Sequence, residues 1–248
     1  MFPTLQIGPL ALQVPGLVIL IAIWAGLSLS KRHAGKFGIK SSDLYNLAIL
    51  MLVAGIIGAR LMYIVHYPQA FLASPSSMIS INPGLLDPVG GLAAGLLAGL
   101  IYIQRKGMPL WTSLDAITPA LAVFGLGTAL SHLASGAAFG APTNLPWAIN
   151  LWGAQRHPTQ IYEIISAAAI LLLIWPGIGP VKPNLPGIYF LSFIALSAGA
   201  RLFLEAFRGD SQLTYLGLRD AQLVAWVILA ISLAGIYWLG HRESVRET

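Results

Sequence analysis

The chain alternates between long apolar runs and short polar segments. Seven apolar runs lie at about residues 12–29, 44–64, 84–103, 116–133, 161–174, 187–207 and 221–239. An α-helix rises about 1.5 Å per residue, so roughly 20 apolar residues cross the ~30 Å hydrocarbon core of a bilayer. The pattern therefore predicts about seven transmembrane helices, of which the fifth is short and ends at Pro176-Gly177.

Composition indicates the same class of protein. Of the 248 residues, 56% are hydrophobic and only 9% are charged, whereas a soluble domain carries about 25% charged residues. So little charge cannot cover a water-facing surface of this size, and the apolar surplus needs lipid as its solvent. We expect an all-α, multi-pass integral membrane protein of the cell (inner or plasma) membrane, with residues 1–248 forming a single transmembrane domain.

The basic residues predict an orientation. Nine of the 14 Lys and Arg lie in the segments after the first, third, fifth and seventh runs, whereas the opposite side has only Arg156, Arg208 and Arg219. Cytoplasmic loops are enriched in Lys and Arg, so the N-terminus is expected outside and the C-terminus in the cytoplasm. This places loops at about 67–83 and 134–160 outside, and it accounts for the basic excess without a nucleic-acid partner.

The chain contains no cysteine, which excludes disulfides, thiolate metal sites and a cysteine nucleophile. No Lys or Arg precedes the first apolar run, so we do not expect a cleaved signal peptide.

Several ionisable residues are expected at one depth, near the outer ends of the helices. A charge inside the hydrocarbon costs about 2.5–3.5 kcal/mol even on a lenient insertion scale, so a group of charges predicts a polar pocket that opens to the outer leaflet. Surplus arginine in such a pocket favours an anionic ligand, and a phospholipid phosphate is available at that depth. The residues of this layer are Arg60, Asp87, His132, His157, Glu163, Arg201 and Glu205.

A structural interpretation competes with this one. Arg201 and Glu205 are four residues apart and share a helix face, so they would also serve as an ion pair that holds helices together, as would Arg60 with Glu163. A histidine at a helix end, such as His132, is commonly an interfacial hydrogen-bonding residue. Asp115 lies at the inner boundary, where we expect a helix N-terminus that Ser113 or Asp115 itself caps.

Four local strings resemble those of the prolipoprotein diacylglyceryl transferase family, and they occur in that family's order. Residues 156–163 read Arg-His-Pro-Thr-Gln-Ile-Tyr-Glu, close to the family's Arg-His-Pro-Ser-Gln-Leu-Tyr-Glu. Residues 201–208 resemble its Arg-Phe-x-x-Glu-x-Phe-Arg string. Residues 58–63 resemble its Gly-Gly-Arg-Leu-Gly-Tyr run, and residues 140–147 its Gly-x-Pro-Thr-x-x-Pro-Trp string.

The resemblance implies a transferase that moves the diacylglyceryl group of phosphatidylglycerol onto a lipoprotein cysteine and releases glycerol phosphate. It implies no metal and no soluble cofactor. Its partners would be phosphatidylglycerol or another anionic phospholipid, together with prolipoprotein signal peptides. The site needs a cation for the phosphate and a base for the thiol. The expected catalytic residues are His132, His157, Arg201 and Glu205, and the expected substrate-binding residues are Arg60, Arg156, Tyr162, Glu163 and Arg208.

The sequence also departs from the family pattern. The family's His-Gly-Gly string is Val89-Gly90-Gly91 here, so its candidate base is absent. The family signature, Gly-Arg-x-Gly-Asn-Phe-x-Asn-Gly-Glu, falls on residues 128–137, where its Arg, both Asn and its Glu are missing and His132 replaces an Asn. The Tyr expected early in the first span is replaced around Pro15-Gly16.

These departures leave three alternatives open. His132 has taken over as the base, or the chain binds phospholipid as an inactive paralogue, or it transfers a different group to a different acceptor. A transporter is a further alternative, but transporters usually show an internal repeat and midplane binding residues, and this sequence shows neither.

Overall fold

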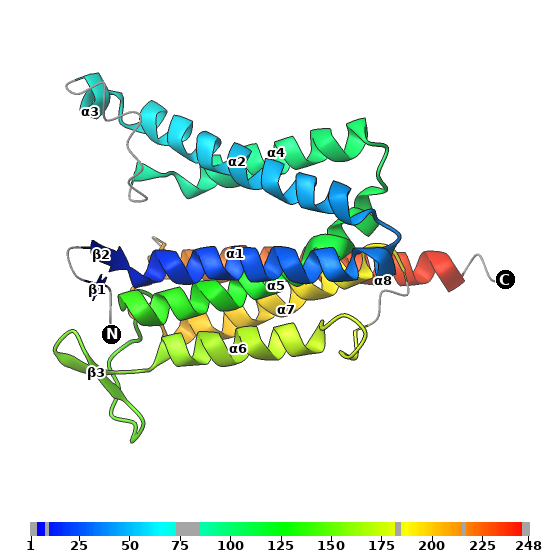
Figure 1. Ribbon diagram of the computed structural model, residues 1–248. Coiled ribbons are helices and arrows are strands. Elements are labelled where there is room, and N and C mark those ends of the chain that lie inside the picture. The colour runs from blue at the N-terminus through cyan, green and yellow to red at the C-terminus, as the bar shows by residue number, and fades with distance from the viewer. Residues whose placement is uncertain (1–3, 8–9, 73–84, 182–184, 215–216, 245–248) are drawn as a thin grey trace. The chain divides into compact units, whose positions relative to one another are not determined.

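The structure is a computed structural model that describes residues 4–7, 10–72, 85–181, 185–214 and 217–244 (Figure 1). Residues 73–83 of the predicted outer loop, Lys182 and Arg246 lie outside the described residues. Helices dominate this part of the chain, and their bounds are α1 Val14–His33, α2 Ser41–His66, α3 Pro68–Leu72, α4 Pro88–Arg105, α5 Leu110–Ser135, α6 Thr159–Leu173, α7 Ile188–Leu204 and α8 Asp220–Ser244. Two 3₁₀ turns, η1 Ala34–Phe37 and η4 Glu205–Phe207, follow α1 and α7.

Each of the seven predicted apolar runs forms a helix. Five helical segments of the described chain are long and apolar enough to cross a membrane: Val14–Phe37, Ser41–His66, Leu110–Ser135, Ile188–Phe207 and Asp220–His241. The helix α6 is shorter and apolar, as the fifth run predicted. The chain is therefore a helical membrane protein, and the count of seven crossings stays a prediction.

Two antiparallel hairpins are present that the sequence did not predict. In one, β1 Thr4–Ile7 pairs with β2 Leu10–Gln13 so that Thr4 faces Gln13. In the other, β3 Ile149–Leu151 pairs with β4 Ala154–Arg156 so that Ile149 faces Arg156. The second hairpin lies within the predicted outer loop 134–160 and leads directly into α6.

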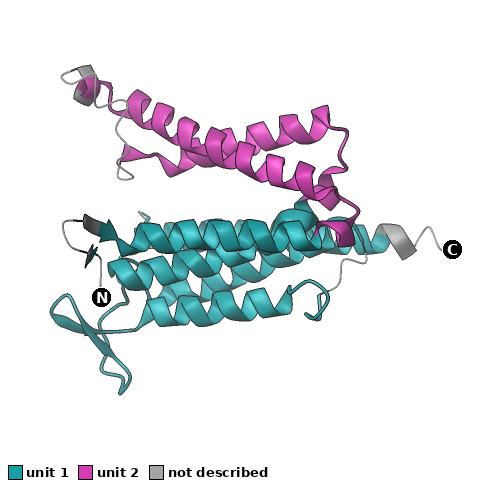
Figure 2. Ribbon diagram, in the orientation of Figure 1, with its two compact units in different colours: residues 1–33, 114–248 teal, residues 34–113 magenta. Residues whose placement is uncertain are grey.

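The chain divides into two compact units, which Figure 2 colours separately. Unit 1 contains residues 1–33 and 114–248, and unit 2 contains residues 34–113. The expectation of one transmembrane domain over residues 1–248 stays a prediction.

Unit 2 is built on close packing of α2 against α4. A Cβ added to Gly91 would lie 3.0 Å from the Cβ of Ala59 and 3.0 Å from the carbonyl oxygen of Gly55, and one added to Gly95 would lie 3.0 Å from the carbonyl oxygen of Met51. Small residues let helix backbones approach in this way. Gly91 and Gly95 are four residues apart and so lie on the same face of α4, the face that packs against α2.

Unit 1 contains α1, most of α5, and α6, α7 and α8 (Figure 2). Helix α1 approaches α5 closely, because a Cβ on Gly26 would lie 2.9 Å from the carbonyl oxygen of Ala120. Pro119 interrupts the hydrogen-bond ladder of α5, and the neighbouring N–H of Ala120 donates to Ser30 Oγ of α1 at 3.0 Å. The Ser30 side chain therefore accepts a hydrogen bond from a backbone donor next to the proline and links α1 to α5.

The prediction that Asp115 belongs to the N-terminus of its own helix is wrong. Helix α5 already begins at Leu110, so Asp115 lies in its second turn and projects onto α7. Its carboxylate accepts hydrogen bonds from the backbone N–H groups of Gly187 at 2.7 Å and Phe190 at 2.8 Å. Asp115 therefore caps the start of a neighbouring helix, where free N–H groups attract a negative charge.

Candidate active site

Glu163 is the centre of an ion-pair cluster on unit 1. It lies near the start of α6, and its Oε2 is 2.7 Å from Nδ1 of His132, in the last turn of α5. Its Oε1 is 2.8 Å from Arg208 Nη1 and 3.7 Å from Arg201 Nη1. One largely buried carboxylate therefore brings together an imidazole and two guanidinium groups from three other parts of the chain.

The contact with Glu163 fixes the tautomer of His132. An ionised carboxylate only accepts hydrogen bonds, so Nδ1 of His132 donates to Glu163 Oε2. In the neutral imidazole, Nε2 is then the basic nitrogen. The side chain of His132 is 31% exposed, so part of the imidazole remains accessible.

Glu205 forms the second carboxylate of the cluster, at the start of η4. Its Oε2 is 3.0 Å from Arg201 Nη2 and 3.9 Å from Arg208 Nε. Its Oε1 accepts a hydrogen bond of 2.6 Å from Ser211 Oγ. The predicted pairing of Arg201 with Glu205 is confirmed, and the pair shares Arg201 with Glu163.

Arg208 is the buried cation of the cluster, with a side chain that is 11% exposed. It donates two parallel hydrogen bonds to Asp210, of 2.9 Å and 2.8 Å, and a third to Glu163. Burial disfavours its charged form, but the hydrogen bond to Asp210 and the surrounding carboxylates outweigh burial, so the pKa of this guanidinium is raised. Arg208 is therefore held as a permanent cation inside the frame of the site.

The charges of the cluster nearly cancel. Three carboxylates pair with two guanidinium groups: those of Glu163, Glu205 and Asp210 with those of Arg201 and Arg208. His132 contacts Glu163, the carboxylate that both arginines share. Arg201 differs from Arg208 because its side chain is 42% exposed. Among the cations that pair with these carboxylates, Arg201 is therefore the one that a ligand can contact without breaking a buried pair.

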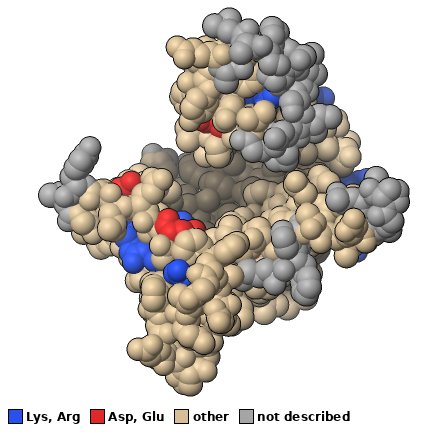
Figure 3. Space-filling model, turned by 90° about the vertical axis from the view of Figure 1, so that its left-hand side faces the viewer, with Lys and Arg blue, Asp and Glu red and all other residues tan. Residues whose placement is uncertain are grey.

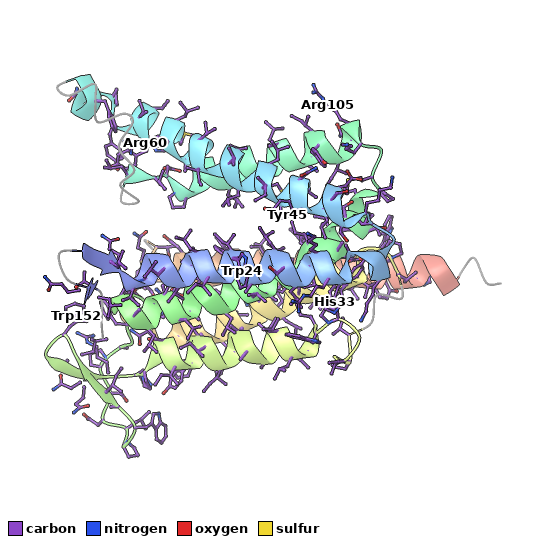
Figure 4. The ribbon with its side chains drawn as sticks, viewed as in Figure 1. Trp24, His33, Tyr45, Arg60, Arg105 and Trp152 are labelled. Carbon is purple, nitrogen blue, oxygen red and sulfur yellow. The ribbon has the colours of Figure 1, made fainter. Side chains whose placement is uncertain are left out.

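The cluster lies at the hairpin end of unit 1. Figure 4 shows Trp152, in the turn between β3 and β4, and His33, the last residue of α1, at opposite ends of this unit. Trp152 Nε1 donates to the carbonyl oxygen of Gly136, just past the end of α5. Figure 3 shows acidic and basic side chains next to one another at this end of unit 1.

Three further predicted residues lie around the cluster. Arg156 donates to the carbonyl oxygens of Leu151 at 3.0 Å and Gly140 at 3.2 Å, so its guanidinium binds the hairpin segment. His157 lies with its ring centroid 5.2 Å from that of Phe207, and among the described residues its buried Nδ1 has no hydrogen-bond partner. Tyr162 Oη accepts a hydrogen bond of 2.8 Å from the indole of Trp147.

Arg60 belongs to unit 2, where Figure 4 shows it at the opposite end from Arg105. It donates to the carbonyl oxygen of Leu85 at 2.9 Å, and its guanidinium lies 5.4 Å from the ring centroid of Phe71. Its pairing with Glu163, a residue of unit 1, stays a prediction. Asp87, of the same layer, caps α4 through a 2.7 Å hydrogen bond from the N–H of Gly90.

Comparison with known proteins identifies the family. The sequence profile of the prolipoprotein diacylglyceryl transferase family matches residues 3–238. The chain belongs to this family. Relatives named phosphatidylglycerol–prolipoprotein diacylglyceryl transferase are found in Synechococcus elongatus, 31% identical over 99% of this chain and 90% of the relative, and in Gloeobacter violaceus, 33% identical over 98% and 94%. A third, from Synechocystis sp., is 34% identical over 94% of this chain and 87% of the relative.

Family membership draws attention to two residues of the 156–163 string that the sequence interpretation left without a role. Thr159 Oγ1 donates to the carbonyl oxygen of Ala138 at 2.6 Å, and Gln160 Nε2 donates to that of Ala137 at 2.9 Å. Both side chains are buried, with at most 1% exposed. They bind the segment after α5 to the first turn of α6, which keeps His132 next to Glu163.

Asp210, Ser211 and Arg219 were also missed. All three lie between η4 and α8, outside the apolar runs. A usable signal was present, because Asp210 follows Arg208 by two residues and a carboxylate so close to an arginine often pairs with it. Helical spacing could not have placed Arg219 in the cluster, because Arg219 shares no helix or strand with the other members. Among the described residues, no group of three or more His, Cys, Asp or Glu could hold a metal ion.

Proposed function

We propose that this chain transfers the diacylglyceryl group of phosphatidylglycerol to the cysteine thiol of a prolipoprotein. Family membership supports the reaction class, and the names of the relatives state this donor and acceptor for those proteins. The observation that carries the proposal is the cluster around Glu163, where one carboxylate contacts both an imidazole and a half-exposed guanidinium.

The reaction requires a base and an anion site. The thiol loses its proton, and the sulfur forms a bond to the glyceryl carbon that carries the phosphate. The bond between that carbon and the phosphate oxygen breaks, and glycerol phosphate leaves with the electron pair. Negative charge therefore grows on the phosphate in the transition state, where a fixed cation stabilises it most effectively.

We assign the anion site to Arg201 and the base to His132. Arg201 is oriented by Glu205 at 3.0 Å, and its side chain is accessible. His132 is oriented through Nδ1 by Glu163, which leaves Nε2 to take the thiol proton. In this proposal His132, held by Glu163, takes the role of the histidine that the family has at the position of Val89.

The remaining predicted residues take supporting roles in this proposal. Arg208 holds Glu163 and Glu205 in place. Arg156, His157 and Tyr162 shape the wall of the site near the hairpin. The substrate-binding role expected for Arg60, a residue of unit 2, stays a prediction.

We further propose that seven helices cross the cell membrane with the N-terminus outside. Helix α4 has 18 residues and α6 has 15, and we assign both as transmembrane helices that are shorter than the other five helical segments. Lys31, Arg32 and His33 lie in the last turn of α1, at the end of unit 1 away from the hairpin, which favours a cytoplasmic position for that end. The cluster would then open to the outer leaflet, where a prolipoprotein signal peptide and phosphatidylglycerol both arrive.

A complementation assay tests the reaction. The chain is expressed in cells depleted of their own transferase, and lipid on a reporter lipoprotein is measured. We expect lipidation by the wild type and by His33→Ala, a matched histidine at the other end of unit 1. At equal protein levels we expect none by His132→Ala and reduced lipidation by Arg201→Gln. Full lipidation by His132→Ala would rule out its role as the base.

The alternative of a non-catalytic phospholipid-binding paralogue rests on the missing residues of the family signature at 128–137. It predicts that the wild type does not lipidate the reporter, although phosphatidylglycerol still co-purifies with the chain. The same cells and the same purified protein therefore separate the two functions.

A further inference from the structure

We propose that Ser211 and Arg219 are positioning residues that orient Arg201 through Glu205. The inference rests on the proposed function of Arg201 as the contact to the lipid phosphate. Neither residue lies in the strings that resemble the family, and in the described part of the chain neither forms a hydrogen bond with Arg201. What joins them to the exposed guanidinium is two hydrogen bonds, from Arg219 to Ser211 and from Ser211 to Glu205, followed by the ion pair between Glu205 and Arg201.

The segment between η4 and α8 folds back on itself and brings the two residues together. Leu213 forms an isolated antiparallel bridge with Arg219, and the N–H of Asp220 donates to the carbonyl oxygen of Gln212 at 3.2 Å. Arg219 Nη1 therefore reaches back to Ser211 Oγ and to the carbonyl oxygen of Arg208, each at 2.7 Å.

The direction of each hydrogen bond follows from the chemistry of the groups. Arginine only donates, so Ser211 Oγ must accept from Arg219. The hydroxyl has a single proton, and it is donated to Glu205 Oε1 at 2.6 Å. Such a short bond is typical of a hydroxyl donating to a charged carboxylate, and Arg219 strengthens it by polarising the hydroxyl.

The consequence for Arg201 comes from the geometry of the carboxylate. Glu205 is 1% exposed, so water does not compensate for a lost donor. While Ser211 holds Oε1, Oε2 stays 3.0 Å from Arg201 Nη2. Without the hydroxyl, the carboxylate is free to turn, and the half-exposed guanidinium loses one of its two fixed partners.

We call the connection from Arg219 through Ser211 and Glu205 to Arg201 the relay. Helix α8 anchors its Arg219 end. Gln222 Nε2, in the first turn of α8, donates to the carbonyl oxygen of Leu202 in α7 at 3.2 Å. The relay is therefore tied by a hydrogen bond to the helix that carries Arg201. A shift of the segment between η4 and α8 would reach Arg201 through two hydrogen bonds and one ion pair.

The test measures transfer by the purified full-length chain in detergent micelles, with phosphatidylglycerol and a cysteine-containing prolipoprotein peptide varied separately. We expect Ser211→Ala to raise KM for phosphatidylglycerol about 10-fold, the usual effect of one hydrogen bond to a charged group, with KM for the peptide unchanged. Arg219→Met should act in the same direction, and Ser211→Thr, which keeps the hydroxyl, should recover most of the affinity.

Gln212→Ala is the matched control, because Gln212 is exposed and contributes its backbone carbonyl to the segment. In an Arg201→Gln background, Ser211→Ala should add no further increase in KM, because the relay acts through Arg201. A loss of kcat with both KM values unchanged would indicate fewer folded molecules only, and would overturn the positioning role. So would a KM for phosphatidylglycerol equal to that of the wild type.

Equilibrium binding separates this inference from the proposed reaction. Retention of fluorescent phosphatidylglycerol and of the neutral phosphatidylcholine on the micelle-bound chain is measured for each variant. If the wild type shows no transfer but Ser211→Ala still weakens phosphatidylglycerol retention selectively, the reaction is wrong and the relay is supported. Equal retention by wild type and Ser211→Ala would refute the relay whatever the enzyme activity.

Discussion

Replacing Glu163 by Gln tests the organisation of the whole cluster. The substitution keeps the size of the side chain but removes the charge that His132 contacts at 2.7 Å and Arg208 at 2.8 Å. Each hydrogen bond to a charged group contributes about 1.5–3 kcal/mol. Arg208 keeps both hydrogen bonds to Asp210, so we expect the free energy of unfolding to fall by only about 1–3 kcal/mol.

Activity should fall much more than stability. Without the carboxylate, His132 loses the partner that fixes its tautomer, and a well-placed general base is worth about 10²–10⁴ in rate. We therefore expect Glu163→Gln to lower kcat at least about 100-fold in a transfer assay with purified protein. Asp43→Asn is the matched control, because Asp43 forms a partly exposed pair with Lys106 at 3.7 Å in unit 2, and such pairs contribute about 0–1 kcal/mol. A folded Glu163→Gln protein with more than about a third of wild-type kcat would refute this account of the site.

Three further substitutions have defined outcomes. Arg201→Gln should raise KM for phosphatidylglycerol about 10-fold or more while leaving KM for the peptide unchanged, and equal changes in both would contradict a lipid-specific contact. Asp115→Ala removes the cap from Gly187 and should lower the free energy of unfolding by about 1–3 kcal/mol, measured by thermal unfolding in detergent, with Asp115→Asn closer to wild type. Gly91→Val places side-chain atoms against Ala59 and should destabilise the chain by about 1–3 kcal/mol; unchanged thermal unfolding would show that α2 and α4 can separate without loss.

The helices could be predicted from the sequence because apolar length alone determines them. The run at 44–64 became α2, Ser41–His66, and the run at 161–174 became the short α6, Thr159–Leu173. The ends moved by a few residues because polar side chains continue a helix beyond its apolar part. The β3–β4 hairpin was missed because its strands have three residues each, too few for a period-two pattern to stand out.

Only one of the contacts within the cluster was predicted, and the roles of its residues in binding and catalysis stay predictions. Five of the predicted residues do lie together in it: His132, Glu163, Arg201, Glu205 and Arg208. Arg201 and Glu205 were paired correctly, because residues four apart on a helix are neighbours. The partners of Glu163 could not be derived, because His132 and Arg208 lie 31 and 45 residues away in sequence. Asp115 was misplaced for the same reason, since its partners are 72 and 75 residues further along the chain.

The proposed function requires this near-neutral cluster to select an anionic lipid although the chain lacks most of the family signature. If attraction depended on total positive charge, the carboxylates of Glu163, Glu205 and Asp210 would oppose it. They instead hold Arg208 buried and leave Arg201 accessible in one orientation, and a fixed charge stabilises a developing charge without reorganisation. The proposed function therefore requires that the fixed orientation of Arg201, rather than extra cations, compensates for the missing signature residues. Substitutions that free Arg201 from its fixed orientation should therefore lower activity. Adding a positive charge elsewhere on the surface of the protein should not restore that loss in full.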